Sequence, residues 1–194
     1  MGSTSNGSLW GIGPEEQRSV YALVTYIPEP LGKFLDGLRI ELMPGCQPHA
    51  HVSLLPPRPL DADWHAASEH ARSLLEQSEP FEIEFTRPAI FPVTGVIYLE
   101  VGAGHETLLR LHQSLNMGAV AFAEPFPYYP HSTLAQGVTP ERVEELHQLA
   151  MRRWQDFPGP HRFLANRAVF VQNLNGNRWV DLATLWLGRL AAKP

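Results

Sequence analysis

The pattern of hydrophobic and polar positions alternates between strand-like and helix-like segments. A run rich in β-branched and aromatic residues, Val20 to Ile27, is followed by apolar residues at helical spacing from Leu31 to Leu38. A short apolar run beginning near Ala50 comes next, and we expect Pro56-Pro57 to stop it. The first part of the chain therefore predicts a strand, a helix and a second strand.

The alternation of strand-like and helix-like segments continues to the end of the chain. Helical spacing predicts three further helices, over residues 64–75, 108–115 and 139–154. Strand-like runs cover residues 81–86, 96–101, 132–135, 163–171 and 179–187. A loop containing Pro88 and Pro92 separates the first two of these runs, and Asn175-Gly176 suits a tight hairpin turn between the last two. This order predicts mixed α and β structure with antiparallel pairing.

Residues at the helix ends support these assignments. Asp61 or Asp63 is suited to cap the helix at 64–75. Thr139-Pro140 provides a cap and a first-turn proline for the helix that follows it.

One short motif occurs twice. His-x-Ser-Leu at 51–54 is matched by His-x-Thr-Leu at 131–134, 80 positions later, and each motif lies at the start of a predicted strand that a helix follows. Because side chains alternate between the two faces of a strand, His51 and Ser53 project to one side, and so do His131 and Thr133. The repeat indicates a duplicated lobe, with the equivalent strands side by side about a pseudo-twofold axis.

Two imidazoles and two hydroxyls are the groups that a phosphodiesterase acting by acid-base catalysis needs. Hydrolysis requires an attacking water that is deprotonated and a departing oxygen that is protonated, on opposite sides of phosphorus. The ordinary imidazole pKa of about 6.5 lets one of His51 and His131 be neutral and the other charged, and the sequence does not assign which is which. The hydroxyls of Ser53 and Thr133 are suited to bind the phosphate. This chemistry requires no metal.

The two motifs and the element order resemble the two-histidine phosphoesterase superfamily, which includes bacterial 2'-5' RNA ligase-like proteins and cyclic phosphodiesterases. The resemblance covers nearly the whole chain after about Val20, although Ser53 stands where threonine is commoner. It implies an α+β fold of two pseudo-symmetric lobes, with largely antiparallel sheet and flanking helices around a central cleft. It also implies chemistry on 2',3'-cyclic phosphates or 2',5'-linked nucleotides, with no cofactor.

Other side chains near the motifs are further candidates. Tyr129 precedes the second motif, where an aromatic ring can stack on a base. Arg58 follows the first motif and is a candidate phosphate ligand, with a solvated surface position as the alternative. His49 forms His-x-His with His51, a pattern that can hold a metal on one strand face. A cupin-like site also needs a glutamate shortly afterwards, and the sequence has none between His51 and Arg58.

Composition limits the classes of partner. The chain has 194 residues, 44% of them hydrophobic, and can bury a substantial core. A formal charge of −5 without a Lys/Arg-rich run disfavours long duplex nucleic acid but allows a small nucleotide or RNA end. With one cysteine, no membrane-length apolar run and no leader-like N-terminus, we expect a cytoplasmic monomer that does not bind membranes.

The expected domain organisation is simple. Residues 1–8 are nearly all Gly, Ser, Thr and Asn and are predicted to be a disordered tail or an expression remnant. Residues 9–194 are predicted to form a single bilobal domain. Two other functions stay open at this point: a noncatalytic nucleotide or RNA-end binding module on the same fold, and a metal-dependent hydrolase that uses His49 and His51.

Overall fold

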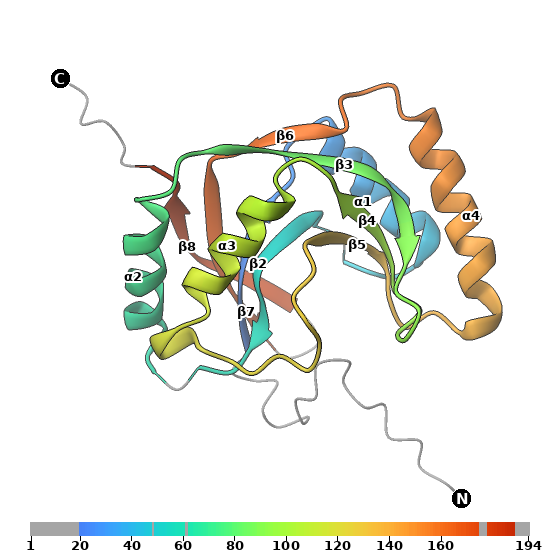
Figure 1. Cartoon of the computed structure of the whole chain (residues 1–194). Coiled ribbons are helices and arrows are strands. Elements are labelled where there is room, and N and C mark those ends of the chain that lie inside the picture. The colour runs from blue at the N-terminus through green and yellow to red at the C-terminus, as the bar shows by residue number, and fades with distance from the viewer. Residues whose placement is uncertain (1–19, 48, 61, 175–177, 189–194) are drawn as a thin grey trace, which may run out of the picture.

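Two antiparallel sheets form the framework of the protein (Figure 1). The computed structural model describes residues 20–47, 49–60, 62–174 and 178–188. The tail predicted for residues 1–8 and the turn predicted at Asn175-Gly176 lie outside the described residues.

The elements confirm the predicted α+β fold. The first half of the chain contains β1 (Val20–Tyr26), α1 (Leu31–Leu42), β2 (His51–Arg58), α2 (Trp64–Leu75) and β3 (Phe81–Ile90). The second half contains β4 (Ile97–Val101), α3 (His105–Leu115), the 3-10 helix η2 (Gly118–Val120), β5 (His131–Ala135), α4 (Pro140–Asp156), β6 (Arg162–Ala165), β7 (Arg167–Leu174) and β8 (Arg178–Trp186).

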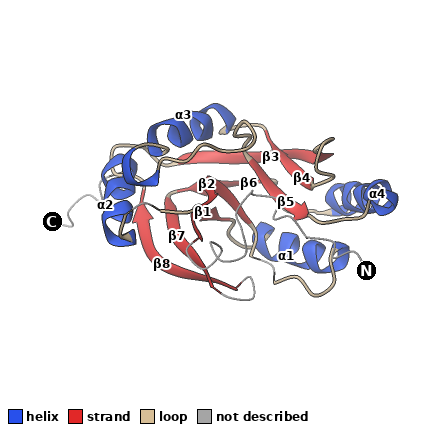
Figure 2. Cartoon of the chain, turned by 90° about the horizontal axis from the view of Figure 1, so that it is seen from below, coloured by secondary structure: helices blue, strands red, loops and turns tan. Residues whose placement is uncertain are grey.

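The two motif strands end their sheets and lie against each other. The strand orders are β2-β1-β7-β8 and β5-β4-β3-β6, and β2 contacts β5 where the sheets meet (Figure 2). Helix α1, which connects β1 to β2, packs against β5, while α3, which connects β4 to β5, packs against β2. This reciprocal packing is the pseudo-twofold arrangement that the repeated motif predicts.

The chain passes between the sheets twice. β3 joins the second sheet, whereas β7 and β8 return to the first. The prediction of a single strand over residues 163–171 is therefore wrong. Two strands, β6 and β7, cover these residues, and they belong to different sheets and are separated at Asn166. The sequence is strand-like on both sides of Asn166-Arg167, and this pattern does not show that the two halves pair with different partners.

Prolines predicted to interrupt strands instead lie within them. β2 continues through Pro56-Pro57, and β3 continues through Pro88. A proline, which has no N–H, is tolerated where a strand has a neighbour on one side only. β2 is an end strand, and β6 pairs only with residues 81–84 of β3, so these prolines lie along open edges. The register of both ladders also shifts, as at β-bulges.

The helices begin much as the sequence predicts. The carboxylate of Asp63 caps α2 by accepting a hydrogen bond from the backbone N–H of His65 at 3.1 Å. Pro140 occupies the first turn of α4 after Thr139, although the Thr139 side chain makes no capping hydrogen bond. Within the described ranges, no helix combines the length and the apolar character needed to cross a bilayer.

One large hydrophobic core joins the two sheets and the helices. It includes Leu35 of α1, Leu134 of β5, Phe85 of β3 and Phe170 of β7, all at most 1% exposed. Because α1 packs against β5 of the other sheet, its apolar face helps to hold the two motif strands in place.

Truncating a fully buried residue of α1 tests that role. Leu35→Ala is expected to lower the free energy of unfolding by about 2–5 kcal/mol, because Leu35 is 0% exposed and its truncation leaves a cavity in the core. The matched control on the same helix, Ile40→Ala, is expected to change it by about 0.5 kcal/mol, since Ile40 is 49% exposed. Urea unfolding measures both, and equal effects would contradict the packing described.

Candidate active site

The two motifs occupy equivalent places in the fold. His51 is the first residue of β2, and His131 is the first residue of β5. In both strands the histidine and the hydroxyl residue two positions on are half-buried, whereas the residues between and after them are buried. The strands therefore present His51 with Ser53, and His131 with Thr133, on the faces turned away from the core.

Both imidazoles are oriented by the same local contact. Nδ1 of His51 lies 2.6 Å from the carbonyl oxygen of His49, and Nδ1 of His131 lies 2.7 Å from that of Tyr129. A carbonyl only accepts, so each Nδ1 carries the proton and donates. Among the described residues, neither Nε2 has a hydrogen-bond partner. Each Nε2 is thus the atom left to exchange a proton with a ligand.

Burial favours the neutral form of both rings. Desolvation lowers the pKa of His51 to about 4, and the positive charges of Arg39, His49 and His131 add to this effect against the hydrogen bond to the His49 carbonyl. Desolvation also lowers the pKa of His131. Desolvation is thus the main cause of the lowered pKa in both rings.

An aromatic wall lies beside His131. The rings of Phe91 and Tyr98 approach the His131 ring edge-on, with centroids at 5.1 and 5.5 Å. Tyr129 is 38% exposed and packs against Phe91, Tyr98 and His105 at 5.5 to 5.9 Å. The structure thus places Tyr129 near the second motif, with part of its ring open to solvent.

A polar row crosses the same face. Glu100 of β4 pairs with His131 of β5, and Tyr98 pairs with Thr133. The Nε–H of Arg87 donates to Oε2 of Glu100 at 2.9 Å. Burial raises the pKa of Tyr98 to about 12, with further contributions from Tyr129 and Glu100. The wall beside His131 therefore carries both aromatic rings and a carboxylate held by an arginine.

The wall beside His51 has a different composition. Tyr26 of β1 pairs with His51, and its hydroxyl donates to Oδ1 of Asp181 at 2.6 Å. The His49 ring stacks on the Tyr26 ring with centroids 3.5 Å apart and planes at 8°. Four small apolar residues continue this face across the sheet: Ala22, Val24, Val169 and Val171.

The contacts of His49 and His51 bear on the hypothesis that these two residues hold a metal. The His49 ring is stacked on Tyr26, and Nδ1 of His51 donates to a carbonyl. The part of the chain that the structure describes contains no group of three or more His, Cys, Asp or Glu residues arranged to hold a metal ion.

Arg58 lies elsewhere. It is 1% exposed rather than solvated, and its guanidinium donates to the Pro56 and Val120 carbonyls, each at 2.9 Å. It also donates to Oδ1 of Asn116 at 2.6 Å and to Glu124. These contacts attach the end of β2 to the segment after α3, so we leave Arg58 out of the proposed substrate site.

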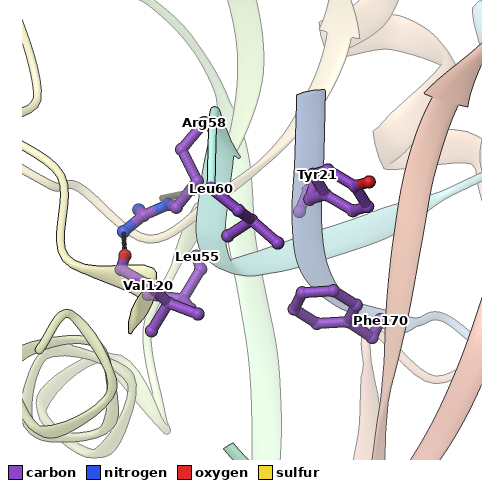
Figure 3. Close-up of a pocket in the computed structure, with 7 residues that line it drawn as sticks. Tyr21, Leu55, Arg58, Leu60, Val120 and Phe170 are labelled. Carbon is purple, nitrogen blue, oxygen red and sulfur yellow. Dashed lines mark hydrogen bonds between the residues drawn. The ribbon is translucent and has the colours of Figure 1, made fainter. Parts of the chain in front are cut away.

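Figure 3 shows the surroundings of Arg58. A narrow pocket lies beside its side chain and is otherwise lined by Tyr21, Ala22, Leu55, Leu60, Val120 and Phe170. The guanidinium points towards the Val120 carbonyl and away from the aromatic rings. None of the four motif side chains lines this pocket.

Sequence reasoning did not single out two residues beside the motifs. Tyr26 falls at the end of a predicted strand, and only the register of β1 with β2 shows that it neighbours His51. Phe91 falls in a loop expected to be irregular, and the sequence offers no signal that it reaches His131.

Comparison with known proteins gives a consistent family. The family described as the 2'-5' RNA ligase superfamily matches residues 28–177. A Staphylococcus epidermidis protein named "Putative phosphoesterase" is 26% identical over 141 residues, which cover 71% of this chain and 80% of that protein. A relative of the same description from Oceanobacillus iheyensis is 28% identical over 149 residues, with coverages of 71% and 83%.

Solved structures share the fold. Escherichia coli LigT complexed with NADP+ has a TM-score of 0.62 at 14% identity, covering 89% of this chain and 99% of LigT. The complex of LigT with 3'-AMP has a TM-score of 0.61 at 16% identity, and the match covers 90% of this chain and 99% of LigT. TT0787 of Thermus thermophilus has a TM-score of 0.62 at 19% identity and covers 88% and 99%. With its two-sheet fold, its paired motifs and the family match over residues 28–177, the chain belongs to the 2'-5' RNA ligase superfamily of two-histidine phosphoesterases.

Proposed function

We propose that the protein is a metal-independent phosphodiesterase that hydrolyses 2',3'-cyclic nucleotide phosphates or 2',5'-linked and other short oligonucleotide phosphodiesters. His51 and His131 share the roles of general base and general acid. Ser53 and Thr133 bind the phosphate, and Tyr129 stacks on the base.

The observation that carries the proposal is the equivalence of the two imidazoles. Each stands at the start of an end strand, these strands lie against each other, and each Nδ1 is committed to a carbonyl two residues upstream. Both Nε2 atoms are thus left for chemistry on one phosphate. In-line displacement needs a base on one side of phosphorus and an acid on the other, which two such rings supply.

The reaction then follows from the protonation states. One neutral imidazole removes a proton from water at its Nε2 as the water oxygen bonds to phosphorus. The bond from phosphorus to the ribose oxygen breaks, and the second imidazole, protonated in the complex, gives its proton to that oxygen. Burial lowers the pKa of both free imidazoles, so we infer that the negative charge of bound phosphate favours the protonated form of one of them.

The surroundings of the motifs support a nucleotide as substrate. Ser53 and Thr133 are half-buried and project from the same strand faces as His51 and His131. Hydroxyls in such positions can donate to phosphate oxygens. The partly exposed Tyr129 ring belongs to the aromatic wall beside His131, and aromatic rings stack on bases. LigT, which shares the fold, forms complexes with NADP+ and 3'-AMP.

Removing either imidazole tests the mechanism. His51→Ala and His131→Ala are each expected to lower kcat for 2',3'-cyclic AMP by about 10² to 10⁴-fold, because each ring supplies one proton transfer. Turnover measured by product chromatography is the readout, with Ile40→Ala as the folded control. Parental rates in either histidine variant would remove the mechanism, whereas tight nucleotide binding without any turnover by the parent would favour the binding-module alternative.

The lowered pKa of His51 predicts a loss of stability in acid. Below pH 6.5 the unfolded chain protonates His51, but the folded protein resists this until pH approaches about 4. The contribution is therefore complete above pH 6.5 and lost as pH falls from there towards 4. His51→Gln is expected to reduce the loss in unfolding free energy between pH 7.5 and pH 5 by about 1–2 kcal/mol, measured by urea unfolding. Identical losses in parent and variant would show that His51 titrates normally.

Chelation separates the proposal from the metal-dependent alternative. Because the proposed acid and base are both imidazoles, the parental rate is expected to persist in excess EDTA. His49→Ala is expected to keep a chelator-insensitive rate. Loss of turnover in EDTA, restored by zinc or manganese, would instead support a site at His49 and His51.

A further inference from the structure

We propose that Tyr128 and His112 are positioning residues that hold the two motif strands at the separation required for catalysis. The inference rests on the proposed function, and it assigns a role to two side chains that are hydrogen-bonded to the β2 backbone and not to the motif imidazoles.

Both side chains bind the backbone of β2 beside its catalytic face. The Tyr128 hydroxyl donates to the carbonyl of Ser53 at 2.7 Å, and Nδ1–H of His112 donates to the carbonyl of Leu54 at 2.9 Å. β2 is an end strand with a backbone partner on one side only, and its register with β1 shifts opposite these residues. Carbonyls on such an edge need other donors when they are buried, and these two rings supply them.

The two rings also support each other. The Tyr128 and His112 rings stack with centroids 3.8 Å apart and planes at 9°. His112 is 9% exposed, and its Nε2 lies 3.5 Å from Oε1 of Glu124, which pairs with Arg58. Burial lowers the pKa of His112 and raises that of Tyr128, so both rings are neutral donors near pH 7.

The contacts connect one motif to the other. Tyr128 lies three residues before His131, and the next residue, Tyr129, provides the carbonyl that orients the His131 ring. From Ser53 to the His131 imidazole, the path thus runs through one side-chain hydrogen bond and a few residues of backbone. Arg58 fixes the same segment to β2 through Asn116, Val120 and Glu124.

This attachment has a catalytic consequence because the motif strands belong to different sheets. Backbone pairing fixes His51 relative to β1 and His131 relative to β4, but side chains and helix packing set the distance between the two strands. A misplacement of about 1 Å between catalytic groups can cost about 10²-fold in rate. Loosening the Tyr128–Ser53 contact should therefore lower kcat more than it affects binding.

Tyr128→Phe tests the positioning role because it removes the hydroxyl and keeps the stacked ring. We expect kcat for 2',3'-cyclic AMP to fall about 10-fold to 10²-fold, with KM changed by about twofold or less. His112→Phe, which keeps a stacked ring and removes the donor to Leu54, is the second variant and is expected to behave likewise. Trp154→Phe is the matched control, since it removes a ring N–H that donates to the Thr86 carbonyl at 3.0 Å in β3, which is neither of the two motif strands. It should lower the melting temperature while leaving kcat unchanged.

A second readout does not depend on turnover. Imidazole resonances of His51 and His131 are followed by NMR over a pH titration in each variant. Because the charge of His131 contributes to the lowered pKa of His51, a changed separation is expected to move the His51 titration in Tyr128→Phe and leave it in place in Trp154→Phe.

The outcomes separate the two proposals. If the parent turns over no cyclic nucleotide, the proposed function fails, and the titration alone decides whether Tyr128 positions the rings. If the parent is active and Tyr128→Phe retains both its kcat and the parental His51 titration, the positioning role is wrong while the proposed function stands.

Discussion

The meeting of two sheet edges is the constraint on which the structure depends. β2 and β5 each end a four-stranded sheet, and each carries a histidine at its first residue. Their separation is set by helices that cross to the opposite sheet, α1 against β5 and α3 against β2. We infer that it is also set by two side chains that bind β2 carbonyls, His112 of α3 and Tyr128 of the segment before β5. The relative position of the two motif histidines thus depends on tertiary packing more than on any one element.

The backbone is repeated but the chemistry of the two walls is not. Both motif imidazoles are oriented by the carbonyl of the residue two positions upstream, yet that residue is His49 in one strand and Tyr129 in the other. The cross-strand neighbour of His51 is Tyr26, and that of His131 is Glu100. A pseudo-symmetric pair of imidazoles thus lies between an aromatic wall on one side and a partly apolar sheet face on the other. Such asymmetry suits the substrate that we propose, which has a base at one end and a phosphate at the other.

Much of this arrangement can be predicted from the sequence because it is local. Helical spacing, strand alternation and the two His-x-Ser/Thr motifs each depend on a few neighbouring residues, and they indicate the element order and the faces of His51 and His131. Features that depend on distant pairing were beyond such reasoning. Pro56-Pro57 lies within β2 because that strand has an open edge, and the split at Asn166 reflects a change of sheet. Arg58 is buried because Glu124, 66 positions away, pairs with it.

The central claim is that both imidazoles act on one phosphate, and a crystal structure of the protein with 3'-AMP tests it most directly. We expect a phosphate between the Nε2 atoms of His51 and His131, with the Ser53 and Thr133 hydroxyls on its oxygens. A phosphate bound by only one of the two motifs, or at a site remote from both, would contradict it.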